Sequence, residues 1–93
     1  MEGQQAVRVR IAGQVQGVGF RAWVQAEARR LGLVGWVRNE RDGSVSALLV
    51  GSRDGVTAML QRLHAGPPAA RVSDVRVEDA VIDERPAGFL VTR

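Results

Sequence analysis

The 93-residue chain contains no cysteine and no lysine. Without cysteine it can form no disulfide, no thiolate nucleophile and no cysteine-ligated metal site. This composition suits a reducing compartment, and we expect a cytoplasmic protein. Without lysine it has no residue for Schiff-base chemistry or for lysine-assisted phosphate transfer. Its formal net charge of +3 therefore rests on arginine.

Aromatic residues make up only 4% of the chain, and tyrosine is absent. Sheets that read nucleic acids stack bases on exposed aromatic rings, and the arginines here are scattered among acidic residues, so we expect no nucleic-acid partner. No apolar run approaches the ~18 residues that a membrane-spanning helix needs. The polar N-terminus, residues 1–5, is unlike a signal peptide. We expect no membrane partner.

Apolar residues recur at intervals typical of strands and helices. Val7, Val9 and Ile11 alternate with charged residues, which is the period of a half-buried strand. The pair at 42–43, Asp-Gly, is typical of a hairpin turn, and Ser52 can cap a helix. The expected strands cover residues 6–11, 35–39, 44–50, 72–78 and 89–91, and the expected helices cover 20–31 and 52–65.

This order of elements, β-α-β-β-α-β with a short extra C-terminal strand, is the split β-α-β arrangement of ferredoxin-like folds. Each helix has one apolar stripe, so both helices should cover one face of a mostly antiparallel sheet. We therefore predict an α+β fold, a ferredoxin-like α/β sandwich. In this topology the first two strands run parallel on either side of the third, so the loop after the first strand can lie beside Asn39.

That loop, Gly13–Arg21, joins the first strand to the first helix. Its glycines allow backbone angles that turn successive N–H groups inward, and the helix start adds unsatisfied donors. Arg21 in the first helical turn opposes the helix dipole at a cost of roughly 0.3–1 kcal/mol. No Asp or Glu between residues 4 and 26 balances it. We infer that a ligand anion does so, most simply a phosphate gripped by the guanidinium.

A plainer interpretation of the same loop is that the glycines only shape a tight turn and Arg21 is solvated. The spacing excludes two nucleotide-binding motifs, because it is not G-x-G-x-x-G and no Gly-Lys-Ser/Thr follows.

Two motifs of the chain resemble the signatures of the acylphosphatases, small α/β enzymes that hydrolyse acyl phosphates. The phosphate-loop signature of that family is similar to Gly13-x-Val15-Gln16-Gly17-Val18-x-Phe20-Arg21, and its second signature is similar to Gly35-Trp36-Val37-x-Asn39-x-x-Asp42-Gly43-x-Val45. Residues 66–72 and 88–89 also resemble family patterns. The resemblance spans nearly the whole chain, so we expect residues 1–93 to form a single acylphosphatase-like domain.

The resemblance implies two catalytic residues, Arg21 to bind the substrate phosphate and Asn39 to position the attacking water. A carboxamide accepts no proton near neutral pH, so Asn39 can hold the water but cannot act as a general base. The expected substrate is a small-molecule acyl phosphate, cleaved to a carboxylate and inorganic phosphate without metal or cofactor. The implied phosphate cradle consists of the amides of Val15, Gln16, Gly17, Val18, Gly19 and Phe20.

Two other functions stay open from the sequence. One is a catalytically silent anion-binding module of the same fold. The other is a detached copy of the acylphosphatase-like domain of hydrogenase-maturation proteins, acting on carbamoyl phosphate.

The remaining polar and aromatic residues favour structural roles. His64, the only histidine, fits a helix C-terminus, and Trp23 and Trp36 fit packing. Leu48 and Val50 fall on the sheet face away from the helices and should be exposed unless the C-terminal segment or arginine stems cover them. We expect a monomer, with a weak homodimer through that face as the alternative.

Overall fold

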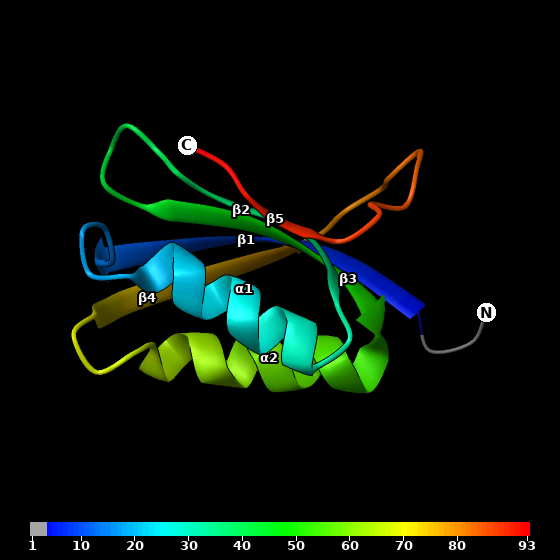
Figure 1. The fold of residues 1–93 in the computed structure, drawn as a ribbon, viewed down its shortest axis with the longest axis horizontal. Coiled ribbons are helices and arrows are strands. Elements are labelled where there is room, and N and C mark those ends of the chain that lie inside the picture. The colour runs from blue at the N-terminus through cyan, green and yellow to red at the C-terminus, as the bar shows by residue number, and fades with distance from the viewer. Residues whose placement is uncertain (1–3) are drawn as a thin grey trace.

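A five-stranded sheet covered on one face by two helices forms the part of the protein that the computed structural model describes, residues 4–93 (Figure 1). The structure does not describe residues 1–3. These residues belong to the polar N-terminal segment that we expect not to be a signal peptide. In chain order the elements are β1 (Gln4–Gln14), α1 (Phe20–Arg30), β2 (Val34–Asn39), β3 (Val45–Ser52), α2 (Arg53–Ala65), β4 (Arg71–Asp79) and β5 (Phe89–Val91).

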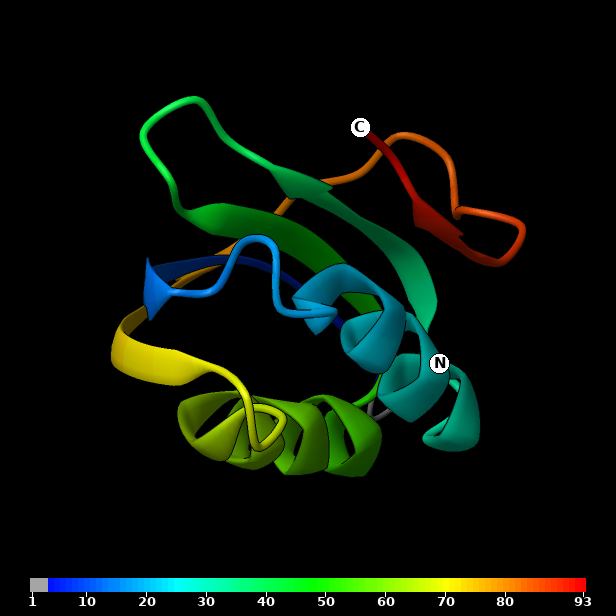
Figure 2. The ribbon, with the colours of Figure 1, turned by 60° about the vertical axis from the view of Figure 1, so that its left-hand side comes forward.

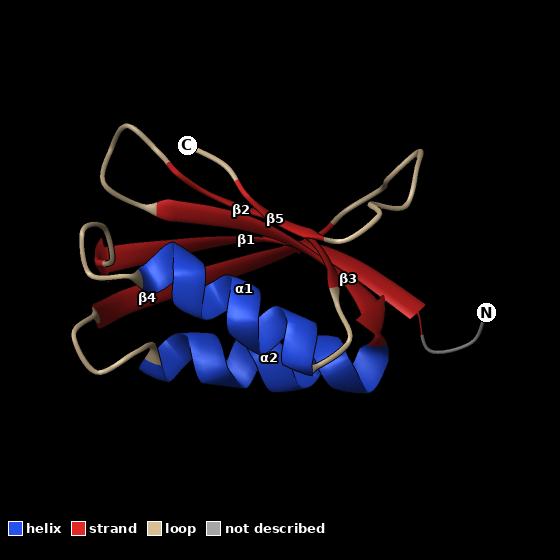
Figure 3. Cartoon of the chain, in the orientation of Figure 1, coloured by secondary structure: helices blue, strands red, loops and turns tan. Residues whose placement is uncertain are grey.

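The strands lie in the order β4-β1-β3-β2-β5. All neighbours are antiparallel except β2 and β5, which are parallel. Because β1 and β2 both run antiparallel to β3, they are parallel to each other and flank it. Both helices lie on the same side of this sheet (Figure 3). The predicted ferredoxin-like sandwich with a short extra strand is confirmed.

The hydrophobic core lies between the sheet and the helices. Val7, Val9 and Ile11 of β1 are at most 1% exposed, so the predicted inward face of that strand is correct. Burying a side chain of this size contributes about 1.5–3 kcal/mol relative to leaving it in water. The helices contribute Phe20, Val24 and Ala28 from α1 and Val56, Met59 and Leu63 from α2.

Local signals set the limits of α2, as predicted. The Ser52 hydroxyl accepts a hydrogen bond of 2.9 Å from the N–H of Gly55, so it caps the first turn. The helix ends at Gly66, whose positive φ of 68° turns the chain out of helical geometry. Two prolines follow and prevent the helix from continuing.

Leu48 and Val50 are only 5% and 4% exposed, so the alternative in which they are covered is correct and the one in which they are exposed is not. Residues 80–88, orange in Figure 1, lead from β4 at one edge of the sheet to β5 at the other, on the side away from the helices. Ile82 and Arg85 of this segment line a hollow together with Val50, and Arg85 Nη1 donates a hydrogen bond of 2.9 Å to Gln4 Oε1. Leu48 and Val50 therefore give no support to a homodimer through this face.

Candidate active site

The loop between β1 and α1 opens where β1 separates from β3. The pairing of β1 with β3 extends to Ile11 and Val45, whereas its pairing with β4 continues to Gln14. Within the loop, Gly17 and Gly19 have φ of 76° and 77°. This left-handed region favours glycine, since other residues have a clash of their own Cβ with the backbone there.

The loop carries main-chain donors that the protein itself does not use. Within residues 4–93, the N–H groups of residues 16–20 donate no hydrogen bond, and the first turn of α1 contains no acidic residue. The helical hydrogen bonds begin only with Trp23, whose N–H donates to Gly19 O at 3.1 Å. Free N–H groups at a helix start can hold an anion, as the sequence predicts.

Arg21 and Asn39 meet at one hollow of about 200 Å³. Arg21 comes from the first turn of α1 and Asn39 from the end of β2. Thus the topology brings together the two residues that the sequence analysis singled out. The full lining is Val15, Gly17, Gly19, Phe20, Arg21, Ala22, Asn39 and Val91.

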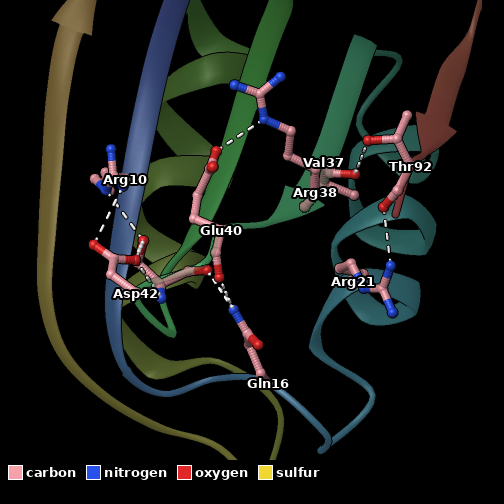
Figure 4. A network of polar contacts seen from close by, with 9 residues as sticks. Arg10, Gln16, Arg21, Val37, Arg38, Glu40, Asp42 and Thr92 are labelled. Carbon is pink, nitrogen blue, oxygen red and sulfur yellow. Dashed lines mark hydrogen bonds and ion pairs between the residues drawn. The ribbon is translucent and has the colours of Figure 1, made fainter.

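Two predicted loop residues do not line this hollow with the rest. Val18 packs against the hydrophobic core. Gln16 directs its side chain to the turn between β2 and β3, where its Nε2 donates hydrogen bonds of 2.8 Å to both Glu40 O and Ser44 O (Figure 4). The sequence indicates a role for the main-chain amide of Gln16 but carries no signal for this side-chain contact.

The C-terminal residues complete one side of the site. The loop at 15–19, the turn at 40–44 and the C-terminus lie at the same end of the sheet (Figures 1 and 2). Arg21 Nη1 donates to Thr92 O at 2.9 Å, and the N–H of Asn39 donates to Arg93 O at 3.3 Å. Thr92 is itself fixed by its N–H, which donates to Val37 O at 2.9 Å. No sequence signal marks these contacts, because the acceptors are main-chain oxygens.

The side chain of Asn39 has an unusual environment. Its Oδ1 is buried and accepts no hydrogen bond within residues 4–93. Leaving a buried polar atom unpaired costs roughly 1–3 kcal/mol, and such atoms are rare in folded proteins. An amide oxygen of this kind beside a hollow is suited to accept a hydrogen bond from a bound water.

The acidic residues near the site point to other partners. Glu40 forms an ion pair with Arg38, with 2.8 Å between Oε2 and Nε, and this hydrogen bond lowers the pKa of its carboxyl group. The Ser44 hydroxyl, at 2.6 Å from Oδ1, lowers the pKa of Asp42. Neither carboxylate lines the hollow. Arg21 is the one charged side chain among the described residues that line the hollow.

A second hollow of about 200 Å³ lies on the outer face of the sheet and includes Arg8, Arg10 and Glu78. It contains none of the predicted site residues. His64 is exposed, with 3.0 Å between Nδ1 and Leu60 O. Among residues 4–93, no cluster of metal-ligating side chains is present, and neither helix has the length and apolarity to cross a bilayer.

The protein is an α/β sandwich in which a glycine-containing loop joins the first strand to the first helix and lines a hollow. The sequence profile of the acylphosphatase family matches residues 7–91. The chain is 56% identical to the acylphosphatase of Rhizobium etli over 88 residues, covering 95% of this chain and 94% of that one. The structure of an acylphosphatase from Coxiella burnetii superposes with a TM-score of 0.92 at 36% identity, covering 98% of this chain and 95% of that one. The chain belongs to the acylphosphatase family.

The full-length HypF protein contains a similar fold. Its structure, in a phosphate- and nucleotide-bound form, aligns with a TM-score of 0.83 and 25% identity. The alignment covers 97% of this chain but only 12% of HypF. The likeness to the Rhizobium and Coxiella proteins, by contrast, extends over nearly their whole length.

Proposed function

We propose that this protein hydrolyses acyl phosphates to a carboxylate and inorganic phosphate, with Arg21 and Asn39 as its catalytic residues. The observation that carries the proposal is the shared hollow, which is lined by Arg21, glycines of the loop and Asn39. The family membership supports the same activity, since the Rhizobium etli and Coxiella burnetii relatives are named acylphosphatases.

The phosphoryl group binds between the guanidinium of Arg21 and the main-chain amides of the loop. A guanidinium has five N–H donors. One hydrogen bond of Nη1 goes to Thr92 O, so the other donors can contact phosphoryl oxygens. The loop amides and the positive end of the α1 dipole neutralise charge on the same oxygens. Such fixed donors stabilise the transition state of phosphoryl transfer without reorganisation.

Asn39 holds the attacking water through its Oδ1, which accepts a hydrogen bond from the water. The water oxygen attacks phosphorus in line with the acyl oxygen, and a new P–O bond forms. The bond between phosphorus and the acyl oxygen breaks, and the carboxylate leaves with its electron pair. The proton of the water passes to a phosphoryl oxygen, so the step needs no protein base.

The chemistry suits a site of this kind. An acyl phosphate is a mixed anhydride with a good carboxylate leaving group, so its hydrolysis depends mainly on positioning and on charge stabilisation. Loop amides, one arginine and one carboxamide supply both.

The test is hydrolysis of benzoyl phosphate in EDTA by the wild type, Arg21→Ala and Arg53→Ala. Arg53 is the matched control, because it is an exposed arginine in the first turn of the other helix. We expect turnover in the wild type and in Arg53→Ala, and its loss in Arg21→Ala. A folded wild type that phosphate protects against unfolding, but that turns over no acyl phosphate, would instead be a silent anion-binding module.

A further inference from the structure

The side chain of Gln16 joins the glycine loop to the turn that follows Asn39. The two hydrogen bonds from its Nε2 end on main-chain oxygens, Glu40 O and Ser44 O, each at 2.8 Å (Figure 4). Both acceptors are carbonyls, so only the nitrogen of the carboxamide can make these contacts, and its orientation is fixed by chemistry. Shape alone does not account for the contact: it needs a donor with two hydrogens at this position.

The loop and the turn have no other polar connection. The main-chain pairing of β1 with β3 stops at Ile11 and Val45, before the loop begins. Within residues 4–93, no main-chain hydrogen bond joins residues 15–19 to residues 40–44. Gln16 therefore supplies the hydrogen bonds between the two segments.

These two segments adjoin different parts of the proposed site. The donors that hold the phosphate, the loop amides and Arg21, belong to one continuous stretch of chain. Asn39, which holds the water, precedes the turn on β2. The path of the water toward phosphorus thus depends on how the turn sits against the loop. Rates fall steeply with such displacements, by about 10²-fold for ~1 Å.

We propose that Gln16 is a positioning residue whose carboxamide fixes Asn39 relative to the bound phosphate. This inference rests on the proposed function. If Gln16 only stabilised the fold, its loss would lower kcat and phosphate affinity together. A positioning role predicts that kcat falls alone. Without the contact, the loop and Arg21 still bind phosphate, but the water no longer lies in line, so kcat falls while phosphate affinity stays.

The test compares Gln16→Met with Gln61→Met. Methionine keeps the length and neutrality of glutamine and removes both donors. Gln61 is an exposed glutamine on α2, so Gln61→Met makes the same chemical change away from the site. Turnover of benzoyl phosphate gives kcat, and calorimetric titration with inorganic phosphate gives Kd. For Gln16→Met we expect kcat to fall about tenfold or more and Kd to stay within about threefold. For Gln61→Met both should match the wild type.

Two results would overturn the inference while the proposed function stands. One is a kcat of Gln16→Met within about twofold of the wild type. The other is a parallel loss of kcat and phosphate affinity, because Gln16 would then shape the loop itself. Should circular dichroism show Gln16→Met unfolded, Gln16→Asn gives the same test, since its amide is too short to reach both carbonyls. A wild type without turnover would overturn the proposed function and this inference together.

Discussion

Arg21 donates a hydrogen bond of 2.9 Å from Nη1 to the main-chain oxygen of Thr92, 71 residues further along the chain (Figure 4). The contact fixes a long side chain that would otherwise lose rotamer entropy when it binds a ligand. It also links the first turn of α1 to the residues that follow β5. The contact therefore restricts the position of the guanidinium that we propose binds the phosphate.

Truncation after Val91 tests this contact. The variant lacks Thr92 O, which holds Arg21, and Arg93 O, which accepts from the N–H of Asn39. A hydrogen bond to a charged group contributes about 1.5–3 kcal/mol, so kcat/KM for benzoyl phosphate should fall at least about tenfold. Phe89, 1% exposed, remains to keep β5 in the core.

The control for this truncation is Thr92→Ala, which keeps the main-chain oxygen. Its kcat/KM should stay close to that of the wild type, since the hydroxyl makes only a long contact of 3.4 Å to Val37 O. Equal losses in the truncated and substituted proteins would show that the side chain, and not the carbonyl, holds Arg21.

Gly17→Ala should weaken phosphate binding and lower stability. Its φ of 76° costs a residue with a Cβ about 1–2 kcal/mol, although the space around the new atom is open. Gly32→Ala is the matched control, because Gly32 has φ of 73° and equally open space but follows the end of α1. Urea unfolding should give similar losses for both variants. Calorimetry with phosphate should detect weaker binding in Gly17→Ala alone.

The sequence was enough to predict how Arg21 and Asn39 come together. The order of strands and helices along the chain predicts a ferredoxin-like strand order, and that strand order brings the loop to the end of β2. The sequence left open whether Leu48 and Val50 are covered, because the segment that lies near Val50, residues 80–88, has no regular apolar period.

The hydrogen bonds of Gln16 and Arg21 were also beyond the sequence. Their acceptors are main-chain oxygens, which every residue carries, so no residue type marks the partner. What selects Glu40 O, Ser44 O and Thr92 O is the exact path of two loops and a chain end. Periodicity determines which face a residue occupies, but it does not determine such paths.

Glu27 should make the stability of the protein depend on pH in the acid range. It lies on α1 and pairs with Arg30 at 2.9 Å and with Arg62 of α2 at 2.6 Å. The hydrogen bond from Arg30 is the main cause that lowers its pKa below 4.5. Because the folded pKa is the lower one, the unfolded chain binds the proton more readily. The stabilisation is thus complete above the unfolded pKa and is lost as pH falls through the folded pKa.

Thermal unfolding of Glu27→Gln at a series of pH values measures this effect. The wild-type Tm should fall on acidification below about pH 4.5, and the fall should be shallower in Glu27→Gln. Glu84→Gln, which changes an exposed glutamate with no ion pair within residues 4–93, serves as the control. Identical pH profiles for the wild type and Glu27→Gln would show that Glu27 does not cause the loss of stability in acid.

Asn39→Ala should separate activity from stability. The Oδ1 of Asn39 has no protein partner within residues 4–93, so the substitution breaks no side-chain hydrogen bond to the protein at this atom. We therefore expect the free energy of unfolding without ligand to change by no more than about 1 kcal/mol. Turnover should fall by roughly 10²-fold or more, because the water has lost its acceptor. Phosphate affinity should change little, since the loop and Arg21 are intact.

Urea unfolding, benzoyl phosphate turnover and phosphate titration on one preparation measure the stability, activity and phosphate affinity of Asn39→Ala. A variant that loses about 2 kcal/mol or more of stability would show that the oxygen is paired in the folded protein, and near-normal turnover would remove Asn39 from the mechanism.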